Sequence, residues 1–373
     1  MALHWKSCFI LSLCFPLLAF SRSSSSETFD EELTVRAMRD GKVASRFSFS
    51  TLLEGATPRN PQNLSTEDDS QHYTLFPLTL GQILREYAVT ELHLTLNAGK
   101  WDYERWGYPD EPDVGTGAEL WAWMGEGGST TVDLRTTSPV LAFAPQGGLP
   151  DWEHPHAVRH ASLPSEHVCT ENLTPFLKLL PCKARAGIAR LLNPHRLFDA
   201  DWHGMGLHVV WLPDAGMQVR LTFQSVADPL RPASHRRDWS FASIFDRTID
   251  TTLSPQPASL EADHAVFDLA QQDLPLNVSM RWDVPFLHAA GASEAPLSVR
   301  RTLLGPTQDY GMLAVSILNA GPATVRAAYL ETMPWIVTFY LHTLVLRVDG
   351  ELRRASLFPP PLLYSLHSLR SYT

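Results

Sequence analysis

The stretch ELHLTLN, Glu91 to Asn97, places leucine at every second position and a polar residue at each position between. Successive side chains of a strand point to opposite faces of the sheet, so this pattern predicts a strand with one apolar face. The same period of two recurs in ELWAWM (Glu119–Met124), LHVVWL (Leu207–Leu212) and QVRLTF (Gln218–Phe223). The sequence therefore predicts a mainly β protein.

Helices are expected to be few and short, because 28 prolines are spread along the chain. Apolar residues at three-to-four spacing predict one helix in PLTLGQILREYA (Pro77–Ala88) and another in ENLTPFLKLLPCKARAGIARLL (Glu171–Leu192). We expect β-sandwich-like packed sheets with a few covering helices. A segment rich in charge and proline, Arg231 to Pro257, separates a predicted N-terminal β-rich domain (27–250) from a second β-rich unit (275–350).

The N-terminal residues 1–21 have the pattern of a secretory signal peptide. Lys6 precedes an apolar run from Cys8 to Phe20, which is too short for a membrane span. Three glycosylation sequons, at Asn63, Asn172 and Asn277, agree with passage through the endoplasmic reticulum. Cys8 and Cys14 would leave with the leader, so Cys169 and Cys182 remain in an oxidising compartment that permits disulfides.

Charge and hydropathy argue against a nucleic-acid partner and against a membrane-spanning helix. The formal net charge is −10 and no Lys/Arg-rich run stands out, so nucleic acid is not expected as a partner. After the leader, no stretch reaches the ~18 uninterrupted apolar residues of a membrane-spanning helix. The C-terminal end also lacks the long apolar run of a GPI attachment signal.

The residues give no positive support for enzymatic chemistry. Cys169 has His167 two positions away, but no nucleophile signature of the caspase or papain type surrounds it. The run EHPHAVRHASLPSEHVC offers zinc-ligand types, but not at the compact spacing of a zinc site; they are His154, His156, His160, His167 and Cys169. No GxSxG, HExxH, Walker or dinucleotide-binding pattern occurs. We therefore predict no catalytic, cofactor-binding or metal-binding residues.

An aromatic-rich stretch, NAGKWDYERWGYPDEP, carries Trp101, Tyr103, Trp106 and Tyr108. Trp and Tyr dominate interaction hot spots, so the stretch is one hypothesis for a binding surface. The other interpretation is a strand and turn whose aromatic rings fill the core. The first interpretation makes the protein a secreted β-sandwich module that binds peptide or sugar.

Several stretches together resemble the PIG-T family of GPI transamidase subunits, and they occur in the family's order over most of Tyr73 to Leu346. The most specific is CTENLTPFLKLLPC, which begins at Cys169 and ends at Cys182. The others are YTLFPLTLGQILREY, ELHLTLNAGKWDYERWGYP, GAELWAWM, RDWSFASIFDRTI and YLETMPWIVTFYLHTL. Residues 351–373 depart from the family pattern as a divergent tail.

The resemblance implies a non-catalytic, lumenal subunit of the endoplasmic reticulum complex that attaches GPI anchors to proteins. Such a subunit stabilises the caspase-like catalytic subunit and helps to present the proprotein substrate, without a cofactor. In the family, the first cysteine of this element forms a disulfide with the catalytic subunit, and the matching residue here is Cys169.

Cys182 has several possible states. A bond between Cys169 and Cys182 would close a short loop that stabilises the fold by ~3 kcal/mol, but a helix between them would hold the sulfurs apart. Between Met124 and Thr136 the chain is shorter than the family and lacks a cysteine that the family carries there. Cys182 is therefore expected as a second disulfide partner or a free thiol. The family's membrane span also has no counterpart in this sequence.

Overall fold

The computed structural model describes residues 2–5, 26–61, 73–110, 115–125, 145–151, 156–166, 168, 170–180, 187–229, 237–248, 259–260, 265–268, 277–281, 295, 297–305, 310–325, 329, 338 and 340–353. The chain divides into two compact units. The first comprises Met1–Trp101, Pro109–Asp133 and Pro145–Ala290, and the second comprises Asp102–Tyr108, Leu134–Ala144 and Gly291–Thr373.

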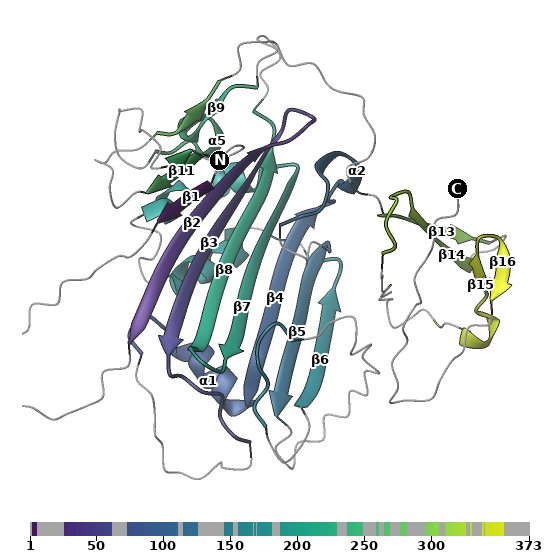
Figure 1. Cartoon of the computed structure of the whole chain (residues 1–373), viewed down its shortest axis with the longest axis horizontal. Coiled ribbons are helices and arrows are strands. Elements are labelled where there is room, and N and C mark those ends of the chain that lie inside the picture. The colour runs from purple at the N-terminus through teal and green to yellow at the C-terminus, as the bar shows by residue number, and fades with distance from the viewer. Residues whose placement is uncertain are drawn as a thin grey trace, which may run out of the picture. The chain divides into compact units, whose positions relative to one another are not determined.

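The first unit is built on one ten-stranded sheet with the order β10-β11-β1-β2-β3-β8-β7-β4-β5-β6 (Figure 1). Neighbouring strands are antiparallel except β1 and β11. The strands are β1 (Ala2–Trp5), β2 (Glu27–Ala37), β3 (Val43–Glu54), β4 (Val89–Gly99), β5 (Gly117–Gly125), β6 (His156–Leu163), β7 (Trp202–Leu212), β8 (Gly216–Ala227), β10 (Ser259–Leu260) and β11 (Ala265–Asp268). A separate pair joins β9 (Trp239–Ser240) and β12 (Ser279–Met280).

Short helices pack on one face of this sheet. They are α1 (Leu78–Glu86), α3 (Thr170–Leu179), the 3-10 helix η1 (Gly187–Leu191), α4 (Pro194–Leu197) and α5 (Phe241–Phe245). Their apolar residues join one core with the inward residues of the strands, including Leu92 and Leu96 of β4. In the core, Phe47 of β3 meets Phe245 of α5 edge to face at 5.3 Å. Such an aromatic contact adds specificity to the packing of a helix on a sheet.

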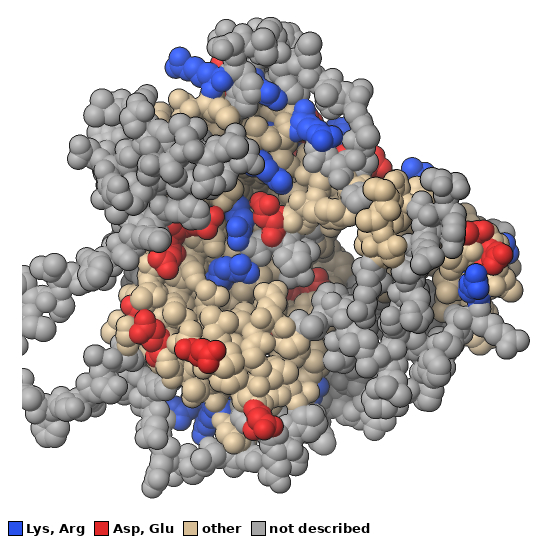
Figure 2. Space-filling model, viewed as in Figure 1, with Lys and Arg blue, Asp and Glu red and all other residues tan. Residues whose placement is uncertain are grey.

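The opposite face of the sheet is polar, because the second residue of each alternating pair points there. The cross-strand register brings His93 of β4 opposite His208 of β7, and His208 opposite Arg220 of β8. Figure 2 shows this face, with acidic and basic side chains interspersed over the strands. Many of its polar residues are nevertheless buried, among them Thr222 at 1% exposure and Asn97 at 3%.

The second unit contains two hairpins. One pairs β13 (Leu297–Leu304) with β14 (Met312–Asn319), and the other pairs β15 (Leu346–Val348) with β16 (Glu351–Arg353). It also includes the 3-10 helix η3 (Leu341–Thr343) and the one-turn helix α2 (Tyr103–Trp106). Asp102 begins α2, because its carboxylate accepts the backbone N–H groups of Glu104 and Arg105.

The mainly β class with few short helices is confirmed, as are the strands at ELHLTLN, ELWAWM, LHVVWL and QVRLTF. In the first unit, the strands form one wide sheet with helices on one face. The predicted helix at Pro77–Ala88 is observed as α1, and the predicted helix at Glu171–Leu192 is observed as α3 followed by η1. The predicted leader, 1–21, contains β1, while residues 6–25 lie outside the described residues. The leader and the predicted boundaries stay predictions.

Candidate functional site

The cysteine-bearing segment, residues 168–188, packs into the core before, within and after the helix α3. Val168 is 7% exposed, and Leu173, Phe176 and Leu180 point from the α3 segment into the core. Phe176 contacts the edge of the Phe223 ring from β8 at 6.0 Å. The position of α3 is therefore set by its apolar side chains. Cys169, Cys182 and His167 themselves lie outside the described residues.

Helix α3 stands between the two cysteines. It runs from Thr170 to Leu179, so Cys169 immediately precedes it and Cys182 follows it by three residues. Ten helical residues span ~15 Å, whereas the Cα atoms of a disulfide lie within ~7 Å of each other. An internal bond would require the chain after Leu180 to turn straight back along the helix. The length of α3 thus favours a partner for Cys169 outside this segment.

The buried carboxylate of Glu31 holds the C-terminal end of the cysteine-bearing segment at Ile188. Glu31 of β2 points to the helical face, and its Oε2 accepts the backbone N–H of Ile188 at 3.0 Å. Gly187 has φ of +65°, and a Cβ there would lie 2.2 Å from Glu31 Oε2. Burial raises the pKa of Glu31 to about 7, and the Ile188 N–H opposes this rise. Glu31 therefore fixes η1, and with it the end of the segment, to the sheet.

The three sequons differ in what the structure describes. Asn63 lies outside the described residues. Asn172 is half-buried in the first turn of α3, and Asn277 is half-buried just before β12. The Asn277 Oδ1 accepts the Ala242 backbone N–H at 3.4 Å, which leaves the opposite end of the amide, Nδ2, outside this contact. Glycosylation at these three residues stays a prediction.

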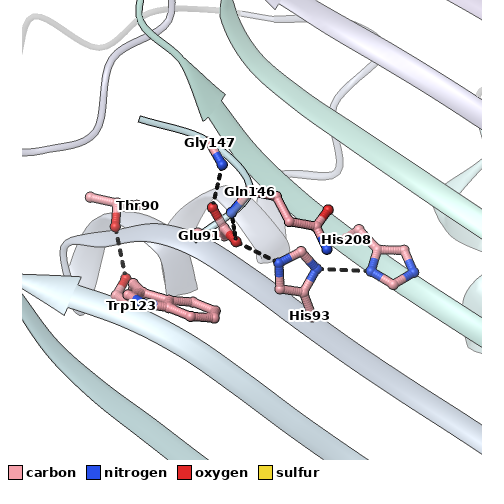
Figure 3. A network of polar contacts seen from close by, with 7 residues as sticks. All are labelled: Thr90, Glu91, His93, Trp123, Gln146, Gly147 and His208. Carbon is pink, nitrogen blue, oxygen red and sulfur yellow. Dashed lines mark hydrogen bonds and ion pairs between the residues drawn. The ribbon is translucent and has the colours of Figure 1, made fainter. Parts of the chain in front are cut away.

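A second site, which the sequence did not single out, lies on the polar face at β4 and β7 (Figure 3). Glu91 is fully buried, and its Oε1 accepts the Gln146 backbone N–H at 2.7 Å and the His93 Nε2–H at 2.7 Å. Its Oε2 accepts the Gly147 N–H at 2.8 Å. One carboxylate thus satisfies three donors. This compensates for the cost of burying it.

His93 connects this carboxylate to His208. Their Nδ1 atoms lie 2.9 Å apart, and both side chains are almost completely buried. Burial lowers the pKa of His208 to about 3, with further contributions from the nearby Arg220, His93 and Arg46 charges. His208 is therefore neutral at physiological pH. The His93 ring therefore bridges the Glu91 carboxylate and the His208 ring.

The hydrogen bonds to Glu91 hold the backbone of the segment at Gln146 in place. The Gly148 N–H also donates to the Trp211 carbonyl at 2.9 Å, so the backbone from Gln146 to Gly148 is held at three successive residues. The His208 Nε2 has no hydrogen-bond partner among the residues that the structure describes. It lies over Gly206, where a Cβ would come within 2.4 Å of it.

At the margin of the sheet, Glu119 of β5 joins the same polar face. Its Oε1 accepts the Trp121 Nε1–H and contacts the His160 Nε2, both at 3.0 Å. The ring centroids of His160 and Trp121 lie 4.0 Å apart, with the two ring planes tilted by 31°. His160 therefore contributes to the packing between β5 and β6. Across the described ranges, no cluster of three or more His, Cys, Asp or Glu is arranged to hold a metal ion, and His154 lies outside those ranges.

The aromatic stretch does not present its tryptophans as a binding face. Trp101 and Trp106 are each 5% exposed, and Trp101 packs edge to face on Trp202 at 4.9 Å. Tyr103 and Tyr108 are the exposed members, and their ring centroids lie 6.5 Å apart in an edge-to-face arrangement. The interpretation in which the tryptophans fill cores is the one that the burial supports.

Comparison with known proteins identifies the class. The family model described as Gpi16 subunit, GPI transamidase component, matches residues 12–134, 129–242 and 240–359. These matches cover most of the chain, including the cysteine-bearing segment and the Glu91 network. The chain therefore belongs to the Gpi16 family of GPI transamidase components, to which the PIG-T proteins belong.

Individual relatives agree with this assignment. The chain is 28% identical to the human GPI-anchor transamidase component PIGT over 88% of this chain and 67% of that protein. It is 28% identical to the Schizosaccharomyces pombe GPI transamidase component PIG-T homolog over 91% of this chain and 71% of that protein. The Saccharomyces cerevisiae GPI transamidase component GPI16 is 23% identical, with 85% and 67% covered. The chain thus spans about two thirds of the length of these relatives.

Proposed function

We propose that this chain is a non-catalytic subunit of a GPI transamidase complex on the lumenal side of the endoplasmic reticulum membrane. The match to the family model along most of the chain carries this proposal. In this role the chain holds the caspase-like catalytic subunit and helps to present the proprotein for GPI attachment. Neither task requires a cofactor. Among the described residues, no helix is long and apolar enough to cross a membrane.

Cys169 is the residue through which the chain holds its partner. The proposed bond joins its sulfur to a cysteine of the catalytic subunit. Two features of the fold support an outward bond: α3 lies between Cys169 and Cys182, and the segment is anchored in the core at Val168 and at Ile188. Because the chain is anchored on both sides of α3, the backbone next to Cys169 is held against the core. Cys182 then remains a free thiol or pairs elsewhere.

Co-purification tests the assignment to the complex. The tagged full chain is expressed in cells and isolated in mild detergent, and the bound proteins are identified by mass spectrometry. The proposal predicts recovery of a caspase-like subunit and the other membrane subunits of the transamidase. Export of the chain with mature glycans, and no such subunits bound, would support the alternative of a secreted binding module and refute the proposal.

A further inference from the structure

Strand β6 lies at one margin of the sheet, where its outer edge has no partner among the described strands. Strand β6 pairs with β5 over eight consecutive residues without a bulge, and no described strand pairs with its other side (Figure 1). At the opposite margin, β10 has only two residues, Ser259 and Leu260. Exposed edges are usually shortened, bulged, or interrupted by lysine or proline, because a long regular edge pairs with other chains. The sequence of β6, HAVRHASL, has no lysine and no proline.

The position of β6 in the chain connects this edge to the proposed disulfide. Leu163 ends β6, and Cys169 follows six residues later. Six residues of extended chain span at most ~20 Å. The Glu166 N–H donates to the Leu163 carbonyl at 3.1 Å, and Val168 is buried, so the connection is short and fixed at two points. A protein bonded to Cys169 is therefore within reach of the β6 edge.

We infer that the catalytic subunit bonded to Cys169 adds one of its own strands to the outer edge of β6. This inference rests on the proposed function and specifies how the partner is held. Main-chain hydrogen bonds along β6 give the non-covalent part of the interface, and the disulfide closes it near the Leu163 end. Ala161 and Leu163 are exposed on the same face of the strand, so the added strand carries apolar side chains next to them.

The backbone direction of β6 identifies the groups that pair. Neighbouring residues of a strand point their N–H and C=O groups to opposite sides. The Gly125 N–H of β5 donates to the Ala88 carbonyl at 2.9 Å, so Gly125 and Trp123 point to β4, and Val158, which lies opposite Trp123, points outward. His160 and Ser162 share this direction, whereas Ala157, Arg159 and Ala161 point to β5. The added strand thus bonds to Val158, His160 and Ser162.

A matched pair of substitutions tests the inference in the full chain co-expressed with the caspase-like subunit. Val158→Pro removes the outward N–H, and Val158→Ala removes the same side chain but keeps that N–H. Both are combined with Cys169→Ser, so that covalent attachment does not hide the loss. We expect Val158→Pro to lower capture of the catalytic subunit by about tenfold and Val158→Ala to change it by less than about twofold. Equal capture by the two variants would overturn the inference.

Hydrogen exchange on the purified wild-type chain, alone and in the complex, gives a second measurement that does not depend on a variant folding. Strand addition slows exchange at alternate amides of β6, those of Val158, His160 and Ser162, and leaves the amides bonded to β5 unchanged. Unchanged exchange along β6 in a complex that forms would refute strand addition while the proposed function stands. Absence of any complex with the wild-type chain would refute the proposed function itself. Pairing of β6 with a second copy of this chain would also contradict the inference.

Discussion

At the scale of single residues, Glu31 makes the stability of the fold depend on pH. Burial raises its pKa from the ordinary value of 4.5 to about 7, so between these pH values the folded chain holds a proton that the unfolded chain has released. The stability due to Glu31 is fully present below pH 4.5 and is lost as the pH rises through 7.

Substitution of Glu31 by glutamine should remove this dependence, because the amide cannot ionise and its oxygen still accepts the Ile188 N–H. Relative to wild type, we expect Glu31→Gln to gain about 2 to 3 kcal/mol in unfolding free energy between pH 5 and pH 8. Urea denaturation at both pH values measures this. A difference between the two proteins that does not change with pH would contradict the role of Glu31.

Gly206 has a steric role on the polar face. A Cβ at this position would lie 2.4 Å from His208 Nε2 and 2.5 Å from Thr222 Oγ1. We expect Gly206→Ala to destabilise the fold by about 1 to 3 kcal/mol, as overpacking usually does. Gly115→Ala is the matched control, because its Cβ would meet only Glu119 Oε2 at 3.7 Å. Similar denaturation midpoints for the two variants would show that the space over Gly206 is not closed.

Glu91 is expected to hold the backbone at Gln146 and Gly147. Glu91→Gln would replace one acceptor oxygen by an NH2 group that faces N–H donors, which costs about 2 to 3 kcal/mol at a buried charged site. We predict faster hydrogen exchange at the Gln146 and Gly147 amides. Glu119→Gln serves as the control, because Glu119 is only half-buried and makes no bond to that segment. Unchanged exchange at the Gln146 and Gly147 amides in Glu91→Gln would show that Glu91 does not hold this backbone.

The sequence predicted which face each residue of β4 occupies, but it did not predict that residues of the polar face are buried. Alternation in ELHLTLN separates Leu92 and Leu94 from Glu91 and His93, and the structure confirms this separation. The same alternation suggests that Glu91 and His93 face water, whereas both are buried. Their burial depends on His208 and on the backbone near Gln146, which are far away in the sequence. Periodicity carries no information on such long-range partners.

At the scale of elements, α3 was predictable as a helix because its apolar residues recur at helical spacing. The residues Leu173, Phe176 and Leu180 all reach the core. The attachment of η1 to the sheet was not predictable, because it depends on the hydrogen bond from Ile188 to Glu31, which is 157 residues away in the sequence. Alternation with Leu33 and Val35 puts Glu31 on the core face of β2, but it does not show which backbone group its carboxylate meets there.

Loosening α3 should affect the proposed disulfide as well as stability. Leu173 is 1% exposed, so Leu173→Ala is expected to cost about 2 to 5 kcal/mol. We predict that it also lowers the fraction of chain bonded to the catalytic subunit on non-reducing gels. The control Lys178→Ala changes an exposed residue of the same helix and should alter stability by no more than about 0.5 kcal/mol. An unchanged bonded fraction in a destabilised Leu173→Ala protein would separate α3 from the attachment.

At the scale of the whole molecule, the family and the mainly β class followed from several sequence stretches taken together. The wide single sheet did not follow, because β3 pairs with β8, which lies more than 160 residues further along the chain, as in the register pair of Ser45 with Ser225. Sequence alternation defines strands but not their order. The sheet order places β6 at a margin of the described sheet, and the cysteine-bearing segment follows β6 in the chain.

The most direct test of the account is disulfide mapping of the assembled complex. The complex is digested without reduction after free thiols are blocked, and the linked peptides are identified by mass spectrometry. The account predicts a peptide containing Cys169 linked to a peptide of the caspase-like subunit. A peptide in which Cys169 is linked to Cys182, from a complex that is intact, would contradict it.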